Sequence, residues 1–289
     1  MRAFVAVVEE GSLSGAARRL HVSQPALSQT ITALERQLGL QLLIRRSTGA
    51  QATEAGLTLL SEARAVLARH DQALAAMARH TTTGGSVLRI GVPLELPADL
   101  LTGPVADLAT AYPDTRVQAR HLSTAVQFEA LRAGELDLGL VRERPVGADF
   151  DATLVVTERL GVLVSAEQAA KIAGPDGIRL DALAGLDWLG FPRAGSPAWY
   201  DELTAILRSH GLELGPPAPE GQELIAEVKL AAVTGGAAFA LAPTNWSQPI
   251  PDSVVWSPLV GHPLVRRTWA AWPAGSHRRD LGLLVSRLG

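Results

Sequence analysis

Residues 13–39 read LSGAARRLHVSQPALSQTITALERQLG, and this stretch decides the fold of the first part of the chain. Small and apolar side chains recur at helical spacing on both sides of a short turn at residues 21–23. Ser23 is suited to cap the second helix, and Pro25 falls in its first turn, where the missing N–H is harmless. The adjacent Ala16 and Ala17 allow two helices to cross closely. The pattern predicts a helix-turn-helix, whose second helix enters the major groove of DNA.

Short polar and amide side chains occupy the outward face of this second helix, and such side chains bond base edges and phosphates. They are Gln24, Ser28, Gln29 and Thr32. Residues 41–53 fit a small hairpin, with Arg45 and Arg46 at its rim, where phosphate or minor-groove contact is expected. The same pattern also fits an ordinary group of short helices with a solvated face. From the pattern alone, DNA binding and a purely structural role remain open.

The charge of the chain is divided unevenly along its length. The chain has 289 residues and a formal net charge of -3, but residues 1–80 carry +3 and the remainder carries -6. A basic front and an acidic remainder suggest different partners for the two parts. The chain has no cysteine, which excludes disulfides, thiolate metal sites and cysteine nucleophiles. No apolar stretch fits a signal peptide or a membrane span, so a soluble cytoplasmic protein without membrane contact is expected.

Residues 54–80 predict one long helix with a narrow apolar stripe. The stripe positions alternate by three and four residues, at Leu60, Ala63, Leu67, His70, Leu74 and Met77. This coiled-coil-like spacing predicts a homodimer through residues 54–80, although packing against the chain's own domain is an alternative. Residues 81–86 read TTTGGS, which is linker composition. The predicted domains are therefore residues 1–53, a helical connector at 54–83, and residues 84–289.

From residue 87 onward, strand and helix patterns alternate, which predicts a mostly parallel, doubly wound sheet. The helix at 124–133 opens with a capping box, Thr124 with Gln127. A second set of strands and helices follows, so two α/β subdomains are expected, at about 87–157 with 267–289 and at about 158–266. Ligands bind in the cleft between such units and at strand carboxyl ends.

Many residues of the chain match, in order, one family pattern. They include Phe4-Val5-Ala6-Val7, Ala16-Ala17-Arg18-Arg19-Leu20, Val22-Ser23-Gln24-Pro25-Ala26-Leu27-Ser28, Arg45-Arg46, Thr53-Glu54-Ala55-Gly56 and Gly134-Glu135-Leu136-Asp137. The chain resembles the LysR-type transcriptional regulators over its whole length. The stretch Phe191-Pro192-Arg193 further resembles regulators of aromatic-compound catabolism.

This resemblance implies an α+β multidomain protein: a winged helix-turn-helix, a long dimerising linker helix and a two-subdomain effector domain of periplasmic-binding-protein type. It implies a dimer, and usually a tetramer, on promoter DNA, with a small-molecule effector in the cleft. The DNA-contacting residues that it adds are Ser23 and Pro25. The effector-binding candidates are Glu95, Ser123, Thr124, Phe191, Pro192 and Arg193.

The chain departs from the family pattern at two points. Relatives usually have several residues before the position of Met1, so either the first helix is shortened or the natural start lies upstream. Many relatives also have a small hydroxyl near Glu95 that holds an anionic effector, whereas a carboxylate here would repel one. The resulting hypothesis is that the effector is neutral or cationic, or that its acid group lies only near Ser123 and Thr124. The alternative is that Glu95 points to solvent.

Enzyme chemistry has little support in the sequence. Nucleophile-elbow, phosphate-loop and zinc-protease motifs are missing, and no two of the seven histidines have metal-ligand spacing on one helix face. The chain is therefore expected to be no enzyme, with no catalytic residue, no metal and no cofactor. The second class considered is a cytoplasmic solute-binding protein without specific DNA recognition, since residues 87–289 alone would suit one. The first 53 residues oppose it.

Overall fold

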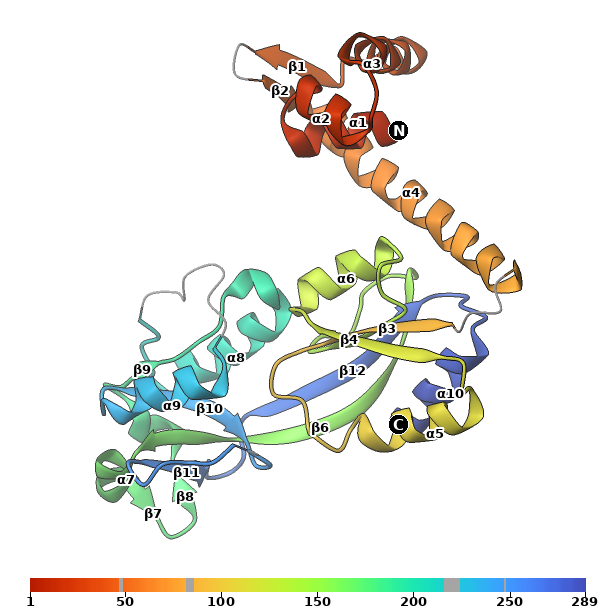
Figure 1. The fold of residues 1–289 in the computed structure, drawn as a ribbon. Helices are drawn as coiled ribbons and strands as arrows, with labels where there is room; N and C mark the ends of the chain where they lie inside the picture. Colours follow the sequence, from red (N-terminus) through yellow and green to blue (C-terminus); the bar gives the residue numbers. More distant parts are fainter. Residues whose placement is uncertain (47–48, 82–85, 216–223, 247) are drawn as a thin grey trace. The chain divides into compact units, whose positions relative to one another are not determined.

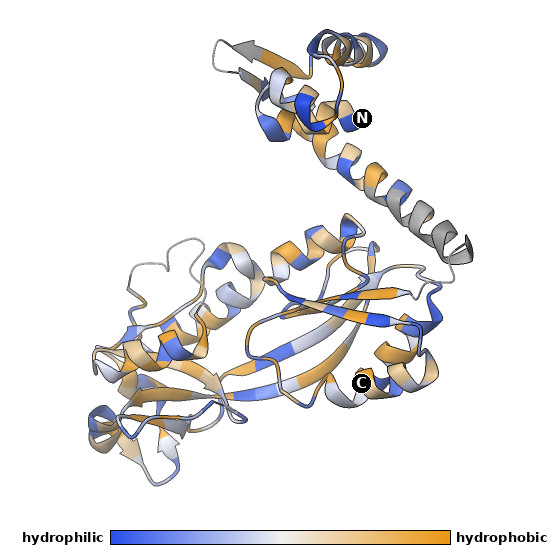
Figure 2. Ribbon diagram, in the orientation of Figure 1, coloured by the Kyte–Doolittle hydropathy of each residue, from blue (hydrophilic) through white to orange (hydrophobic). Residues whose placement is uncertain are grey.

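A computed structural model describes residues 1–46, 49–81, 86–215, 224–246 and 248–289. It contains two compact units, one formed mainly by residues 1–83 and the other mainly by residues 84–289. Each unit has its own buried apolar clusters. Figure 1 shows the elements of the chain, and Figure 2 shows the hydropathy of its residues along the ribbon.

The first unit consists of three short helices, a hairpin and a long helix. Its first elements are α1 (Arg2–Glu10), α2 (Leu13–Arg19), α3 (Gln24–Leu38), β1 (Leu43–Arg46) and β2 (Gly49–Ala52). Phe4, Val7, Leu27 and Ile31 are almost completely buried where the helices meet. The hydrophobic spacing seen in the sequence therefore forms the core of a winged helix-turn-helix.

The long helix α4 (Glu54–Thr81) continues from the hairpin. Ala63 is fully buried, and Leu60 packs against the core of the same unit. The first part of the predicted stripe is therefore covered by the chain's own helices, which was the alternative to pairing with a second chain. Leu57 and Val66 remain 59% and 51% exposed, and the side chains of Leu74 and Met77 lie outside the described residues.

The second unit is built on a sheet in the order β4-β3-β5-β12-β6-β10-β9, with β11 also paired to β6. Its strands are β3 (Val87–Val92), β4 (Arg116–His121), β5 (Leu138–Val141), β6 (Phe150–Ser165), β9 (Asp187–Trp188), β10 (Ala238–Pro243), β11 (Val254–Pro258) and β12 (Val265–Pro273). Two further short strands, β7 (Ala173–Gly174) and β8 (Gly177–Ile178), form a separate ribbon. The helices are α5 (Thr102–Ala111), α6 (Thr124–Arg132), α7 (Ala166–Ile172), α8 (Pro197–Ser209), α9 (Ala226–Thr234) and α10 (Arg279–Leu288).

The expectation of a mostly parallel sheet is wrong. The pairs β3–β4, β3–β5 and β9–β10 are parallel, but β6 pairs antiparallel with β10, β11 and β12, and β12 pairs antiparallel with β5. The long strands β6 and β12 run through both lobes, as Figure 1 shows. Lobe I contains β3, β4, β5, α5, α6 and α10, and lobe II contains α7, α8, α9, β9, β10 and β11. Local periodicity shows that a strand exists but does not give its partner or direction.

Candidate functional site

The helix-turn-helix is fixed by side-chain caps at both of its helices. The hydroxyl of Ser12 accepts a hydrogen bond from the Gly15 N–H at 3.1 Å, and the hydroxyl of Ser23 accepts one from the Ala26 N–H at 3.4 Å. At its other end, α3 stops at Gly39, whose φ of 67° is left-handed and favours glycine. These caps set the start and end of α3, and with them the side chains that face outward.

The predicted DNA-contacting residues of α3 lie together on its outer side. The exposed members are Ser23, Gln24, Pro25, Gln29 and Thr32, whereas Ser28 is half-buried. The Gln24 side-chain oxygen accepts a hydrogen bond from the Ser14 hydroxyl at 3.0 Å, which orients the amide. The face therefore presents donors and acceptors suited to base edges and phosphates.

The predicted hairpin forms the wing. Strand β1 pairs antiparallel with β2, with Arg45 opposite Ala50 and Arg46 opposite Gly49. A Cβ atom on Gly49 would lie 2.3 Å from the Gly11 carbonyl oxygen, so glycine allows the wing to approach the end of α1. Arg45 and Arg46 thus lie on the wing strand, although their side chains fall outside the described residues.

Glu9 joins three helices of the first unit, and no sequence pattern had singled it out. Its carboxylate accepts hydrogen bonds from Arg19 at 2.8 Å and from Arg64 at 3.0 Å. Burial alone would raise the pKa of Glu9, but hydrogen bonds from the two guanidinium groups lower it below its ordinary value. The pair with Arg64 attaches α4 to α1.

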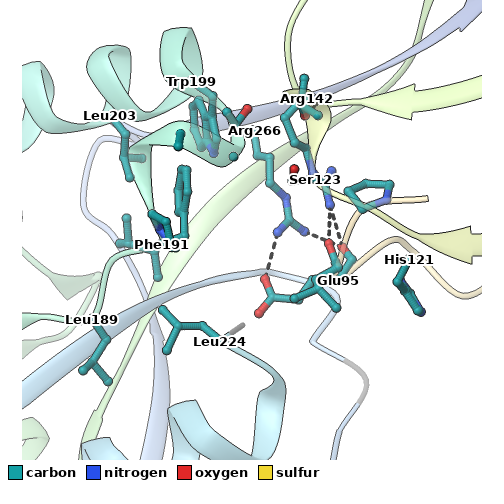
Figure 3. Close-up of a pocket in the computed structure, with 18 of the residues that line it drawn as sticks. Glu95, His121, Ser123, Arg142, Leu189, Phe191, Trp199, Leu203, Leu224 and Arg266 are labelled. Atoms are coloured by element: carbon teal, nitrogen blue, oxygen red, sulfur yellow. Dashed lines mark hydrogen bonds and ion pairs between the residues drawn. The ribbon is translucent and has the colours of Figure 1, made fainter. Parts of the chain in front are cut away.

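A cavity of about 590 Å³ lies between the two lobes of the second unit (Figure 3). Its apolar wall includes Leu160, Trp188, Phe191, Trp199, Leu203 and Leu241. The rings of Trp188, Phe191 and Tyr200 contact one another, with Phe191 edge-on to both neighbours. Such contacts hold the wall in one arrangement before any ligand enters.

The structure brings five of the six predicted effector-binding residues to this cavity. They are Glu95, Ser123, Thr124, Phe191 and Pro192. Arg193 is not part of the lining. Its exposed guanidinium instead binds Asp201 through two hydrogen bonds of 2.8 and 2.7 Å.

Thr124 lies in the first turn of α6, but the predicted capping box with Gln127 is wrong. The Thr124 hydroxyl accepts a hydrogen bond from the Arg142 N–H at 3.1 Å. The Gln127 side-chain amide donates to the Leu122 carbonyl at 2.8 Å instead. Both side chains are buried, and they bond the strands and loops beneath the helix rather than each other.

Glu95 does not point to solvent, so that alternative is wrong: its side chain is only 15% exposed. Its carboxylate is bound by the Lys229 ammonium on one oxygen and by Arg266 at 2.9 Å on the other. Burial alone would raise the pKa of Glu95, but Lys229 and Arg266 lower it below its ordinary value. Two cations are bound to this carboxylate, and the hypothesis that the effector is neutral or cationic, or has its acid group only near Ser123 and Thr124, stays a prediction.

Arg142 and Arg266 also line the cavity, and Glu158 lies close to both of them. Arg266 binds both oxygens of Glu158, at 3.0 and 3.2 Å, and Arg142 lies 3.6 Å from the same carboxylate. Arg142 also donates to the Leu94 and Glu95 carbonyls. Burial and the charge of Arg266 lower the pKa of Arg142 to about 9. We call Glu95, Arg142, Glu158, Lys229 and Arg266 the cleft-floor cluster.

Another carboxylate joins the two lobes at the edge of the cavity. Glu143 follows β5 in lobe I, and one of its oxygens accepts hydrogen bonds from the start of α8 in lobe II. The donors are the Ser196 hydroxyl at 2.7 Å, the Ala198 N–H at 3.1 Å and the Trp199 N–H at 3.3 Å. A carboxylate is favoured here because the first N–H groups of a helix have no partner within the helix.

Sequence reasoning missed Arg142, Glu143, Glu158, Lys229 and Arg266. Four different segments contribute them: the loop after β5, the middle of β6, α9 and the start of β12. The only available signal was rarity, since Lys229 is one of two lysines in the chain. Figure 2 shows hydrophilic residues on the long strands, where a buried strand would be apolar.

Among the described residues, no group of three or more histidines, aspartates or glutamates could hold a metal ion. Within that same part of the chain, the helices are too short or too polar to cross a bilayer.

The two units together define a class of protein: a DNA-binding regulator that carries a ligand-binding domain. Two family models match the chain. The bacterial regulatory helix-turn-helix protein model of the lysR family covers residues 1–57, and the LysR substrate binding domain model covers residues 81–285. The chain therefore belongs to the LysR family, as a DNA-binding transcriptional regulator with an effector-binding domain.

Known relatives agree with this assignment. The chain is 32% identical over 247 residues to the HTH-type transcriptional regulator BenM of Acinetobacter baylyi. This alignment covers 85% of this chain and 79% of BenM. An uncharacterized regulator of Escherichia coli, YnfL, is 28% identical over 94% of this chain and 91% of its own length. The crystal structure of full-length BenM matches with a TM-score of 0.60 and 28% identity over 99% of this chain and 93% of that chain. These matches support a regulator and give no support to a solute-binding protein without DNA recognition.

Proposed function

We propose that this chain binds promoter DNA through the outer face of α3 and the wing, and that a small molecule in the cavity changes this binding. The α3 residues assigned to DNA are Ser23, Gln24, Pro25, Ser28, Gln29 and Thr32, with Arg45 and Arg46 on the wing. The observation that carries the proposal is the cavity between two lobes, with a charged floor and apolar wall, in a chain that also has a helix-turn-helix. It acts in the cytoplasm, where its DNA is, and without catalysis.

The ligand acts by shifting a conformational equilibrium. Because Glu143 of lobe I binds the start of α8 in lobe II, and Glu95 of lobe I binds Lys229 of lobe II, the relative position of the lobes depends on contacts around the cavity. A ligand changes that position only by its differential affinity for the two arrangements.

The protein works as a dimer through α4, and as a tetramer on DNA. Exposed Val66 on α4 favours a partner helix, since an exposed apolar side chain on a long helix gains from burial. A Val66→Glu change is expected to shift the protein toward monomer in sedimentation velocity. An unchanged sedimentation coefficient would show that α4 does not form the dimer interface.

Retardation of the DNA upstream of the protein's own coding sequence tests DNA binding directly. Arg45→Ala is expected to weaken binding to all sequences, because it removes an ionic contact. The slope of log K against log salt concentration should fall by the contribution of about one phosphate contact. Gln29→Ala is expected to relax base preference with an unchanged salt slope. Equal effects of both changes would overturn this division of roles, and no specific shift at any salt concentration would overturn DNA recognition.

A further inference from the structure

The cleft-floor cluster has an excess of one positive charge. Among the charged side chains that the structure describes there, three are cations (Arg142, Lys229 and Arg266) and two are carboxylates (Glu95 and Glu158). The side chains of all five are at most 15% exposed. Buried charges are stable when they are balanced, so one unbalanced cation in such a place attracts an anion.

The charged forms of two of these cations, Lys229 and Arg142, are disfavoured by their surroundings. Burial lowers the pKa of Lys229 from its ordinary value, and the charges of Arg266 and Arg142 lower it further, against the opposing effect of Glu95. Burial and the charge of Arg266 likewise lower the pKa of Arg142. An additional negative charge next to these groups would relieve both effects. All three cations line the cavity, so that charge can come from a ligand.

Two of the chain's own carboxylates already occupy positions suited to an acid group, Glu95 in the lining of the cavity and Glu143 next to the lining residue Ser196. Glu95 occupies the space between Lys229 and Arg266. Glu143 occupies the start of α8, where it takes the Ser196 hydroxyl and two backbone N–H groups. A ligand with two acid groups would therefore bring one more negative charge than the cavity can balance.

The rest of the cavity favours an apolar body. Trp188, Phe191, Trp199 and Leu203 form a wall without charged groups, and the volume of about 590 Å³ accommodates a small aromatic or aliphatic molecule. Burial of such a body supplies affinity, and the floor supplies the single polar contact that orients it.

We propose that the cavity selects molecules with one acid group on an apolar body, and that Glu95 and Glu143 exclude molecules with two. The acid group binds at the face of the cleft-floor cluster that Arg142, Lys229 and Arg266 present to the cavity. Glu95 and Glu143 are thus specificity-determining residues. This inference rests on the proposed role of the cavity as the effector site.

Calorimetric titration of the full-length chain tests the proposal with two matched series. The first series is para-toluate, para-toluamide and terephthalate, and the second is hexanoate, hexanamide and adipate. Within a series the molecules have similar size but carry one, no or two acid groups. At least one monoacid is expected to bind, and at least about tenfold more tightly than its amide and its diacid. Equal or tighter binding of the diacid or amide would overturn the proposal, as would no binding of either monoacid up to about 10 mM.

Two variants assign the selectivity to particular residues. Lys229→Met leaves two cations and two carboxylates in the cleft-floor cluster. This change is expected to remove the preference for the monoacid over the amide. Glu143→Gln keeps the shape of the side chain but removes its charge, and is expected to raise the affinity for the diacid about tenfold. Unaltered selectivity in both variants would show that the wall, not the charges, selects the ligand.

Matched controls separate this inference from the proposed function. Lys171→Met changes the other lysine, which is exposed on α7, and Glu202→Gln changes an exposed carboxylate on α8. Both are expected to keep the wild-type preferences. Retardation of the same DNA is measured in parallel. Lost ligand selectivity with intact DNA retardation overturns only the ligand class, whereas lost DNA retardation overturns the regulator function.

Discussion

Two ionic clusters of the second unit both join basic side chains to carboxylates but differ in charge balance. The cleft-floor cluster has one more cation than carboxylates, and four of its five residues line the cavity. The other, which we call the strand-end cluster, lies where β3, β5 and α10 meet. It consists of Arg89, Asp137, Arg278 and Asp280, two cations with two carboxylates.

Arg278 is the main cation of the strand-end cluster. Arg278 binds Asp280 at 2.7 and 3.0 Å, Asp137 at 2.9 Å and the Val87 carbonyl at 3.0 Å. None of its four residues lines the cavity between the lobes. The comparison teaches that a balanced cluster fixes the fold, whereas an unbalanced one next to a cavity leaves room for a ligand's charge.

The largest effect is expected for Arg278→Met. It leaves Asp137 and Asp280 buried without their main cation, and should lower the free energy of unfolding by about 3–5 kcal/mol. Denaturant unfolding of the full chain measures it. Arg193→Met removes an exposed pair with Asp201 and should cost at most about 1 kcal/mol. If Arg278→Met and Arg193→Met lowered the free energy of unfolding by the same amount, the burial of the Arg278 ion pairs would not explain the loss.

A smaller effect, about 3 kcal/mol, is expected for Glu158→Gln, because it leaves three cations with one carboxylate in the cleft-floor cluster. The two clusters are expected to respond differently to a bound acid. Added para-toluate should stabilise Glu158→Gln more than wild type, since it supplies the missing negative charge, but should give Arg278→Met only the wild-type increment. Equal increments in all three proteins would contradict the difference between the clusters.

The two parts of the chain also differ in how far sequence predicts them. The helix-turn-helix follows from local features, because the Ser23 cap, Pro25 and Gly39 act within a few residues. The effector cavity follows only in outline: the resemblance predicts that Ser123 and Phe191 bind the effector, and both side chains line the cavity.

The cleft-floor cluster could not be predicted, because its contacts join residues far apart in the chain. Glu95 and Arg266 are 171 positions apart, and Glu95 and Lys229 are 134 apart. A one-residue change of strand register would separate these groups, and register depends on the whole sheet. Glu95 was therefore recognised as unusual, but its partners were not.

An intermediate effect is expected for Asp280→Asn, and it depends on pH. Burial would raise the pKa of Asp280, but the hydrogen bonds and charge of Arg278 lower it below its ordinary 3.8. A lowered folded-state pKa stabilises the protein above the unfolded-state value, and this stabilisation is lost as pH falls through the folded-state value. The variant should be about 2 kcal/mol less stable than wild type at neutral pH, with the gap closing below about pH 4. A pH-independent gap would contradict the ionic contribution of this carboxylate.

The smallest effect on stability is expected for Lys229→Met, although this residue is as buried as Arg278. Removal of Arg278 leaves a balanced cluster one cation short, whereas removal of Lys229 leaves two cations with two carboxylates, and Glu95 keeps Arg266 at 2.9 Å. Burial also lowers the pKa of Lys229, so the folded protein gains less from its charge. The expected cost is therefore about 1 kcal/mol or less, against at most about 0.5 kcal/mol for the exposed Lys171→Met. A loss as large as that of Arg278→Met would show that the cleft floor is balanced by its own residues, and the ligand would then have no charge to neutralise.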